Sequence, residues 1–136
     1  MKKLMIVLLL SLFVVVQMRC GKRSNRAFSN HFWTSKKTEG KLFLYVDDNY
    51  KGVIPYLPEA PSWSDDNLKE KTLPLRMPSG DYKIAVKDEQ NHVRIEQLLT
   101  LKLSNNNTTI SSKSENDMGA IKSVLHNDCL IEELYF

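Results

Sequence analysis

The sequence predicts a mainly β protein, a small antiparallel β-sandwich whose C-terminal segment forms either a further strand or a short helix. Two observations predict this class. Apolar and polar residues alternate with a period of two in several runs between residues 41 and 112, and clusters of Asp, Asn, Gly and Pro separate the runs. The length of 136 residues suits one domain, and a hydrophobic fraction of 42% can supply its core. This composition excludes a disordered or collagen-like chain.

The first expected element is a hairpin over residues 41–56. Alternation places two leucines and Val46 on one face of its first strand, and Phe43 and Tyr45 on the other. The Asp47–Asn49 segment predicts the turn, because Asp and Asn bond their own backbone and tolerate left-handed conformations.

The next expected element is a long ordered loop over 57–72. All five prolines fall within 55–78, and a stretch so rich in proline cannot supply continuous donors to a ladder. The alternating residues 73–77 suit an edge strand. Further strands are expected over 82–87, 93–103 and 108–112. Gln97 is the one polar residue on the apolar face of the strand over 93–103.

The C-terminal segment after Ser114 has two interpretations. Asp117 could cap a short helix that carries Met118, Ile121 and Leu125 at helical spacing. The alternation of Leu130, Leu134 and Phe136 fits a strand equally well.

The first nineteen residues have the pattern of a secretory signal peptide. Lys2 and Lys3 precede an apolar run that is shorter than the roughly 20 residues a spanning helix needs. Cys20 directly follows this region and resembles the cysteine of a bacterial lipoprotein signal, although Arg19 stands where that family has a small residue. The resemblance implies a lipid on Cys20 and a location in the cell envelope, at the outer membrane facing the periplasm. An uncleaved signal anchor and ordinary secretion remain as alternatives.

The two cysteines, Cys20 and Cys129, have mutually exclusive fates. A disulfide between them is permitted in an exported chain and would stabilise it by about 4–5 kcal/mol in the chain-entropy model. A lipidated Cys20 cannot form that bond, and Cys129 would then be a buried thiol or would pair between molecules. Neither cysteine has the spacing of a metal site.

We expect residues 20–40 to form a lipid-anchored basic tether and residues 41–136 to form the domain. The tether's lysines and arginines could lie on anionic head groups, while Phe28, Phe32 and Trp33 either rest at the membrane or fold back onto the domain. Because Lys2, Lys3 and Arg19 precede Cys20, the remaining 16 basic residues balance 16 acidic ones. A global basic field for nucleic acid is therefore absent.

Two segments of the predicted domain resemble a PEGA-type repeat. Residues 44–55 (LYVDDNYKGVIP) match its first hairpin, and residues 75–86 (LRMPSGDYKIAV) match its later half. The likeness covers roughly residues 41–103. It implies a small antiparallel β-sandwich module of bacterial envelope proteins, of a kind thought to bind proteins or surface polymers, and it adds no catalytic residue.

The candidate interaction residues are Tyr56, Trp63, Asp65 and Asp66. Aromatic rings with polar neighbours on a loop suit a protein contact or stacking on sugar rings, unless Trp63 folds inward. The acidic clusters at 47–49 and 65–67 lack calcium-loop spacing and are interpreted as turns. The three histidines lie far apart in the sequence, and no GxSxG elbow occurs. No cofactor or metal is expected.

The sequence therefore predicts a non-enzymatic envelope lipoprotein that presents a small β-sandwich to an envelope protein partner. The alternative is a glycan- or cell-wall-binding module that uses the 56–67 aromatic loop. A third hypothesis, a secreted enzyme that uses Asp65 and Asp66, requires one of these carboxyl groups to have a raised pKa.

Overall fold

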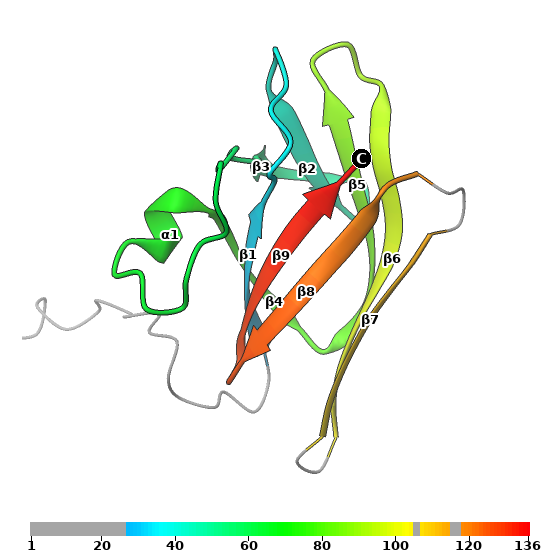
Figure 1. The fold of residues 1–136 in the computed structure, drawn as a ribbon. Helices are drawn as coiled ribbons and strands as arrows, with labels where there is room; N and C mark the ends of the chain where they lie inside the picture. Colours follow the sequence, from blue (N-terminus) through cyan, green and yellow to red (C-terminus); the bar gives the residue numbers. More distant parts are fainter. Residues whose placement is uncertain (1–26, 105–106, 115–117) are drawn as a thin grey trace, which may run out of the picture.

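The computed structural model describes residues 27–104, 107–114 and 118–136 (Figure 1). The signal-like segment and Cys20 lie outside these residues, as do Asp117 and the centre of one turn. The described chain forms these elements: β1 (Ala27–Trp33), β2 (Leu42–Val46), β3 (Asn49–Val53), α1 (Leu68–Lys71), β4 (Leu73–Pro78), β5 (Gly80–Asp88), β6 (Val93–Ser104), β7 (Asn107–Ser114), β8 (Ala120–His126) and β9 (Cys129–Tyr135).

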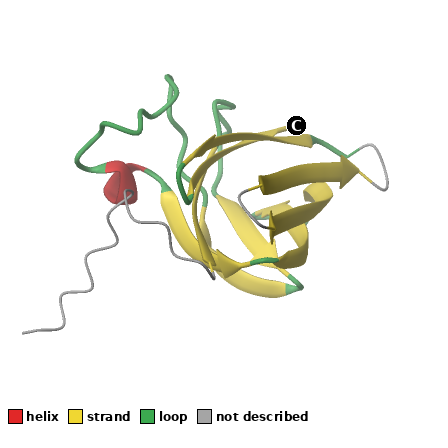
Figure 2. Ribbon diagram, turned by 90° about the horizontal axis from the view of Figure 1, so that it is seen from below, coloured by secondary structure: helices red, strands yellow, loops and turns green. Residues whose placement is uncertain are grey.

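The strands form two sheets that pack face to face, so the predicted β-sandwich is confirmed (Figures 1 and 2). One sheet has four strands in the order β4-β1-β9-β8, and the other has five in the order β3-β2-β5-β6-β7. All pairs of neighbouring strands are antiparallel except β1 and β9, which run parallel. The β1–β9 pair joins the two ends of the described chain.

The predicted first hairpin is present as β2 and β3. Asp47 and Asp48 both have positive φ, at 49° and 65°, which is the backbone of a two-residue type I′ turn. The Asp47 carboxylate also accepts the N–H of Lys83 at 2.9 Å. This contact fixes the turn against β5, so the two acidic residues act here as turn formers.

The prediction of a tether over residues 20–40 is wrong from Ala27 onward. Ala27–Trp33 forms β1, an inner strand of the four-stranded sheet. Phe28 and Phe32 enter the core between the sheets, and Trp33 packs on the sheet's outer side with Ile131 and Leu68. The alternative in which these aromatic residues fold back onto the domain is the one observed. Burial of the three aromatic side chains outweighs the basic residues around them.

The expected loop over 57–72 contains a four-residue helix, α1, and packs against the outer side of the four-stranded sheet. Leu57, Trp63 and Leu68 cover Trp33 and Ile131 there. The loop is therefore a cover for one sheet face. Figure 1 shows α1 beside β1 and β4, outside the sandwich.

The C-terminal segment is a β-hairpin, so the alternative of a short helix is wrong for the described residues. β8 and β9 are joined by a two-residue turn in which Asn127 has a φ of 54°. Leu130 and Leu134 alternate into the core, as the strand interpretation predicted. Ile121 and Leu125 are four residues apart, a spacing that places two side chains on the same face of either a helix or a strand, which is why both patterns fitted.

The core between the sheets is mainly apolar, and the polar side chains buried in it include Gln97, Glu132 and Asn30. Gln97, the predicted polar interruption of β6, is 3% exposed and donates to the carbonyl oxygen of Gly119 at 2.7 Å. Glu132 of β9 is fully buried and accepts a hydrogen bond from Ser123. The core's fully buried apolar side chains are Phe32, Leu44, Ile84, Val86, Ile95, Leu99, Leu101, Leu130 and Leu134.

Candidate functional site

The predicted interaction residues do not form one patch. Trp63 is half-buried, packs with the cluster around Trp33, and has its ring 5.5 Å from the imidazole of His126 with a 30° tilt. One face of the indole is therefore covered by another ring. The inward-folded interpretation of Trp63 describes its position, and Trp63 stabilises the loop on the sheet.

Asp65 and Asp66 lie on the turn that precedes α1. The Asp65 carboxylate accepts the backbone N–H of Ser62 at 3.0 Å and lies 3.5 Å from the Lys71 ammonium. The Ser62 bond, and then Lys71, lower the pKa of Asp65. Asp66 is exposed on the same turn. The acid–base hypothesis required a raised pKa, and the pKa of Asp65 is shifted in the opposite direction.

Tyr56 lies apart from Trp63, at the end of the sandwich where the chain passes between the sheets. Its side chain is 44% exposed. The Thr34 N–H donates to the carbonyl of Pro55 at 3.1 Å, and the Leu57 N–H donates to the carbonyl of Thr34 at 3.0 Å. These two bonds fix the backbone on both sides of Tyr56, so its ring is presented from a rigid position.

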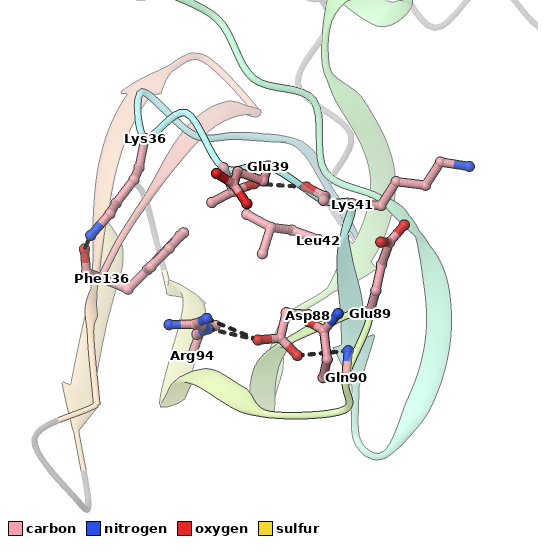
Figure 3. A pocket seen from close by; sticks show the side chains of 11 residues that line it. Lys36, Glu39, Lys41, Leu42, Asp88, Glu89, Gln90, Arg94 and Phe136 are labelled. Carbon is pink, nitrogen blue, oxygen red and sulfur yellow. Dashed lines mark hydrogen bonds and ion pairs between the residues drawn. The ribbon is translucent and has the colours of Figure 1, made fainter.

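A cavity of about 530 Å³ opens at the same end of the sandwich (Figure 3). Its wall includes the Asp88–Arg94 pair, in which the Arg94 guanidinium bonds the carboxylate at 2.9 and 3.0 Å. Lys36 donates to the main-chain oxygen of Phe136 at 2.7 Å. Hydrogen bonds within the protein thus engage these polar groups, and Leu42 and the Phe136 ring supply apolar lining.

Asp88 organises the wall of this cavity. Desolvation by burial acts to raise its pKa, but hydrogen bonds from the His92 N–H, Arg94 and the Gln90 N–H, with the charge of His92, hold it below the ordinary value. An ionised carboxylate with this many donors is a structural anchor for the β5–β6 turn. It is not poised as a general acid.

The edges of the four-stranded sheet differ in their capacity to bind another strand. The Ser29 N–H of β1 donates toward β9, so the neighbouring N–H groups of β1 point to β4 and pair with Leu73, Leu75 and Met77. The remaining positions of β4 face outward, and two of them are Pro74 and Pro78. The predicted edge strand is confirmed, and proline blocks most of its outer donors.

The opposite edge, β8, is open over its second half. The Ile121 carbonyl accepts a hydrogen bond from Ser112 of β7 at 3.1 Å, so it points away from β9. By alternation, the N–H and C=O groups of Ser123 and Leu125 point the same way. Beyond Ile121, β7 and β8 diverge (Figure 1), and Val124 and Leu125 are 46% and 40% exposed. Strand addition at an open edge is a plausible binding mode for a sandwich, but no local sequence signal identifies β8 as the open edge.

Cys129 begins β9, is 2% exposed and is disulfide-bonded. The burial expected for this residue is observed, and the unpaired thiol expected for a lipidated chain is not. The other cysteine of the chain, Cys20, lies outside the described residues. Since one sulfur cannot hold both a thioether and a disulfide, a lipid on Cys20 and an intrachain bond exclude each other.

Within residues 27–104, 107–114 and 118–136, no group of three or more His, Cys, Asp or Glu side chains is placed to hold a metal ion. No helix in the same ranges has the length and apolar character that crossing a membrane requires. Tyr56 lines a cavity, and the open β8 edge is a second, separate surface.

Comparisons with protein-family models, with curated proteins and with solved structures found no significant match to this chain.

Proposed function

We propose that this chain is an exported, non-enzymatic binding module of a bacterial cell envelope, and that it holds a protein partner by adding one of the partner's strands to β8. The observation that carries the proposal is the position of Leu125. Its backbone N–H and C=O point outward from the sheet, and its side chain is 40% exposed where β7 diverges from β8. A strand added there would satisfy the backbone groups and cover Leu125 and Val124.

The proposal of export is supported from both ends of the chain. Residues 1–19 have the pattern of a signal peptide, and disulfide-bonded Cys129 suits an oxidising compartment. A lipid on Cys20 would place the module at the outer membrane facing the periplasm, but the disulfide of Cys129 favours the other fate of Cys20. If Cys20 instead pairs with Cys129, the same module is released as a soluble periplasmic or secreted protein.

The polar contacts of His31 and Thr72 support the proposal that the module is not an enzyme. The His31 ring nitrogen Nδ1 lies 3.0 Å from the Thr72 hydroxyl. Both residues are buried, and Thr72 donates its own proton to the carbonyl of Leu68 at 2.6 Å. This hydroxyl therefore accepts from His31, which is the reverse of an activated nucleophile.

The glycan-binding alternative depends on aromatic rings that a sugar can reach. Trp63 has one ring face covered by His126, so its loop offers less stacking surface than the sequence suggested. Tyr56 keeps its exposed position. The protein-binding proposal is favoured because the β8 edge has both unpaired backbone groups and exposed apolar side chains.

The test is capture of a partner from gently solubilised native membranes, with a photo-crosslinking residue at position 125. Leu125→Pro removes the outward N–H, and Leu125→Ala trims the side chain while keeping that N–H. Leu98→Lys is the matched control, because Leu98 is similarly exposed, at 37%, but lies on the other sheet.

We expect one stoichiometric envelope protein whose strand cross-links to position 125. Its capture should be abolished in Leu125→Pro, weakened in Leu125→Ala and unchanged in Leu98→Lys. Equal capture by the proline variant and the unmodified chain would refute strand addition at β8. Failure to cross-link any protein at position 125 would also refute it.

A further inference from the structure

A second cavity, of about 260 Å³, adjoins the one in Figure 3 across the segment that links β1 to β2. We call it the Tyr56 groove. Its apolar floor is formed by Leu42 and Ile54, which are buried and joined by a hydrogen bond from the Ile54 N–H to the Leu42 carbonyl at 2.9 Å. One wall carries Tyr56 and Val53, and the other is the 34–41 segment.

The charged side chains that line the Tyr56 groove are all positive. Three lysines line it, Lys36, Lys37 and Lys41, and no carboxylate of the described chain does. Lys36 is held at its tip by the main-chain oxygen of Phe136. Lys37 and Lys41 make no ion pair with any residue that the structure describes. Two cations are thus available to a ligand at this groove.

The acidic side chains of the linking segment and its neighbours lie on the other side. Glu39 and Glu89 line the cavity of Figure 3, and the Glu89 carboxylate packs against the backbone of Gly40, where a Cβ would lie 2.9 Å from its oxygen. The linking segment therefore separates a mixed-charge cavity from a purely cationic one. Positive and negative side chains offset each other in the first cavity, so an anion would meet net attraction in the second.

From these contacts we propose that the Tyr56 groove binds an acidic sugar unit of a polysaccharide. The sugar ring would lie against the exposed face of Tyr56, and its carboxylate, phosphate or sulfate group would lie between Lys37 and Lys41. A concave site of this size fits one ring better than it fits the flat surface of a folded protein or membrane. The rigid backbone at Thr34 and Pro55 lowers the cost of ordering the site. The proposal is independent of strand addition at β8.

The experiment is affinity electrophoresis of the full chain in native gels that contain polygalacturonate, with dextran gels as the neutral reference. Lys37→Ala/Lys41→Ala removes the two available cations. Lys102→Ala/Lys113→Ala removes the same charge from β6 and β7, away from the groove. Tyr56→Ala and Tyr56→Phe test the ring, since the second variant keeps the stacking face. Circular dichroism confirms that each variant is folded.

We expect polygalacturonate to retard the unmodified chain and the Tyr56→Phe and Lys102→Ala/Lys113→Ala variants equally. Lys37→Ala/Lys41→Ala should weaken binding by about tenfold or more, because it removes two donors to a charged group. Tyr56→Ala should weaken binding about tenfold, because it removes the stacking ring. Equal weakening by both lysine pairs would overturn the proposal in favour of general electrostatic attraction. Equal binding of polyglutamate or of anionic phosphatidylglycerol vesicles would overturn it in favour of a peptide or a membrane.

Discussion

His31 and Glu132 lie on the adjacent parallel strands β1 and β9, one residue apart in register and on opposite faces of the sheet. His31 lies on the outer face, where its ring contacts Thr72, and Glu132 lies in the core, where it accepts from Ser123. Desolvation by burial, and then the charge of Lys69, lower the pKa of His31 to about 4. Desolvation raises the pKa of Glu132 to about 7, against the opposing effect of the Ser123 bond. Burial thus favours the neutral form of both side chains.

The two shifts predict opposing pH dependences of stability in an overlapping window. For Glu132 the folded state holds a proton that the unfolded state releases between pH 4.5 and about 7, so stability falls as pH rises. For His31 the unfolded state binds a proton between about pH 4 and 6.5 that the folded state does not, so stability rises with pH. Each slope reaches about 1.4 kcal/mol per pH unit at most. We expect the two to largely cancel between pH 4.5 and 6.5.

Single substitutions should reveal the pH dependence of stability that each residue contributes. In Glu132→Gln, the free energy of unfolding should rise with pH between 4.5 and 6.5, and in His31→Asn it should fall with pH up to about 7. Urea unfolding at half-unit pH steps measures both. A flat profile in both variants would show that neither group is kept neutral by burial.

Gly119, before β8, is predicted to be intolerant of any side chain. Its φ is +73°, and a Cβ built there would lie 2.5 Å from the Tyr135 carbonyl oxygen and 2.6 Å from an Ile95 carbon. Its own carbonyl also accepts from Gln97 in the core. Gly119→Ala should lower the free energy of unfolding by roughly 1–3 kcal/mol, from backbone strain and the clash.

Thermal and urea unfolding measure the Gly119→Ala effect, and Gly80→Ala provides the comparison. Gly80 has ordinary space around its Cβ position, with the nearest atoms at 3.6 Å or more. A loss of stability equal to that of Gly80→Ala would contradict the strain at Gly119.

Much of the five-stranded sheet could be predicted from sequence, because its signals are local. The Asp47–Asp48 turn, the alternation of β5 and the polar Gln97 all lie where period and turn chemistry indicated. The four-stranded sheet depends on the pairing of His31 with Ile131, which lie a hundred residues apart. Register between such distant strands leaves no trace in a single local window.

The buried polar residues explain the other differences from the sequence prediction. In β1, Asn30 and His31 are both buried, so the strand lacks the alternation of buried and solvent-exposed residues that marks a half-buried strand. In β9, Glu132 takes a core position, which made the strand pattern look incomplete.

Tyr56 and Trp63 looked like one patch because they are close in sequence. Pro55 and Leu57, on either side of Tyr56, bond to Thr34 at one end of the sandwich, and Trp63 packs over the outer face of the four-stranded sheet.

Trp63 should contribute to stability and leave polysaccharide binding unchanged. Its indole packs on the cluster of Trp33, Leu68 and Ile131, and loss of this half-buried contact costs roughly 1–2 kcal/mol. Trp63→Ala should therefore lower the midpoint of urea unfolding, whereas exposed Tyr56→Ala should change it little. Retardation of Trp63→Ala in polygalacturonate gels should equal that of the unmodified chain. Loss of retardation with an unchanged midpoint would instead make Trp63 a ligand contact.

The two fates of Cys20 predict different masses and different responses to reductant. If Cys20 pairs with Cys129, the chain purified from its native envelope is not acylated, gives a cross-linked tryptic peptide pair, and loses about 4–5 kcal/mol of stability on reduction. If Cys20 is lipidated, mass spectrometry finds acyl chains on an N-terminal cysteine peptide, and Cys20→Ser moves the protein from the membrane fraction to the soluble fraction. Because Cys129 is 2% exposed and disulfide-bonded, we expect the cross-linked pair. An alkylatable Cys129 thiol in the unfolded, unreduced protein would contradict that expectation and favour the lipid.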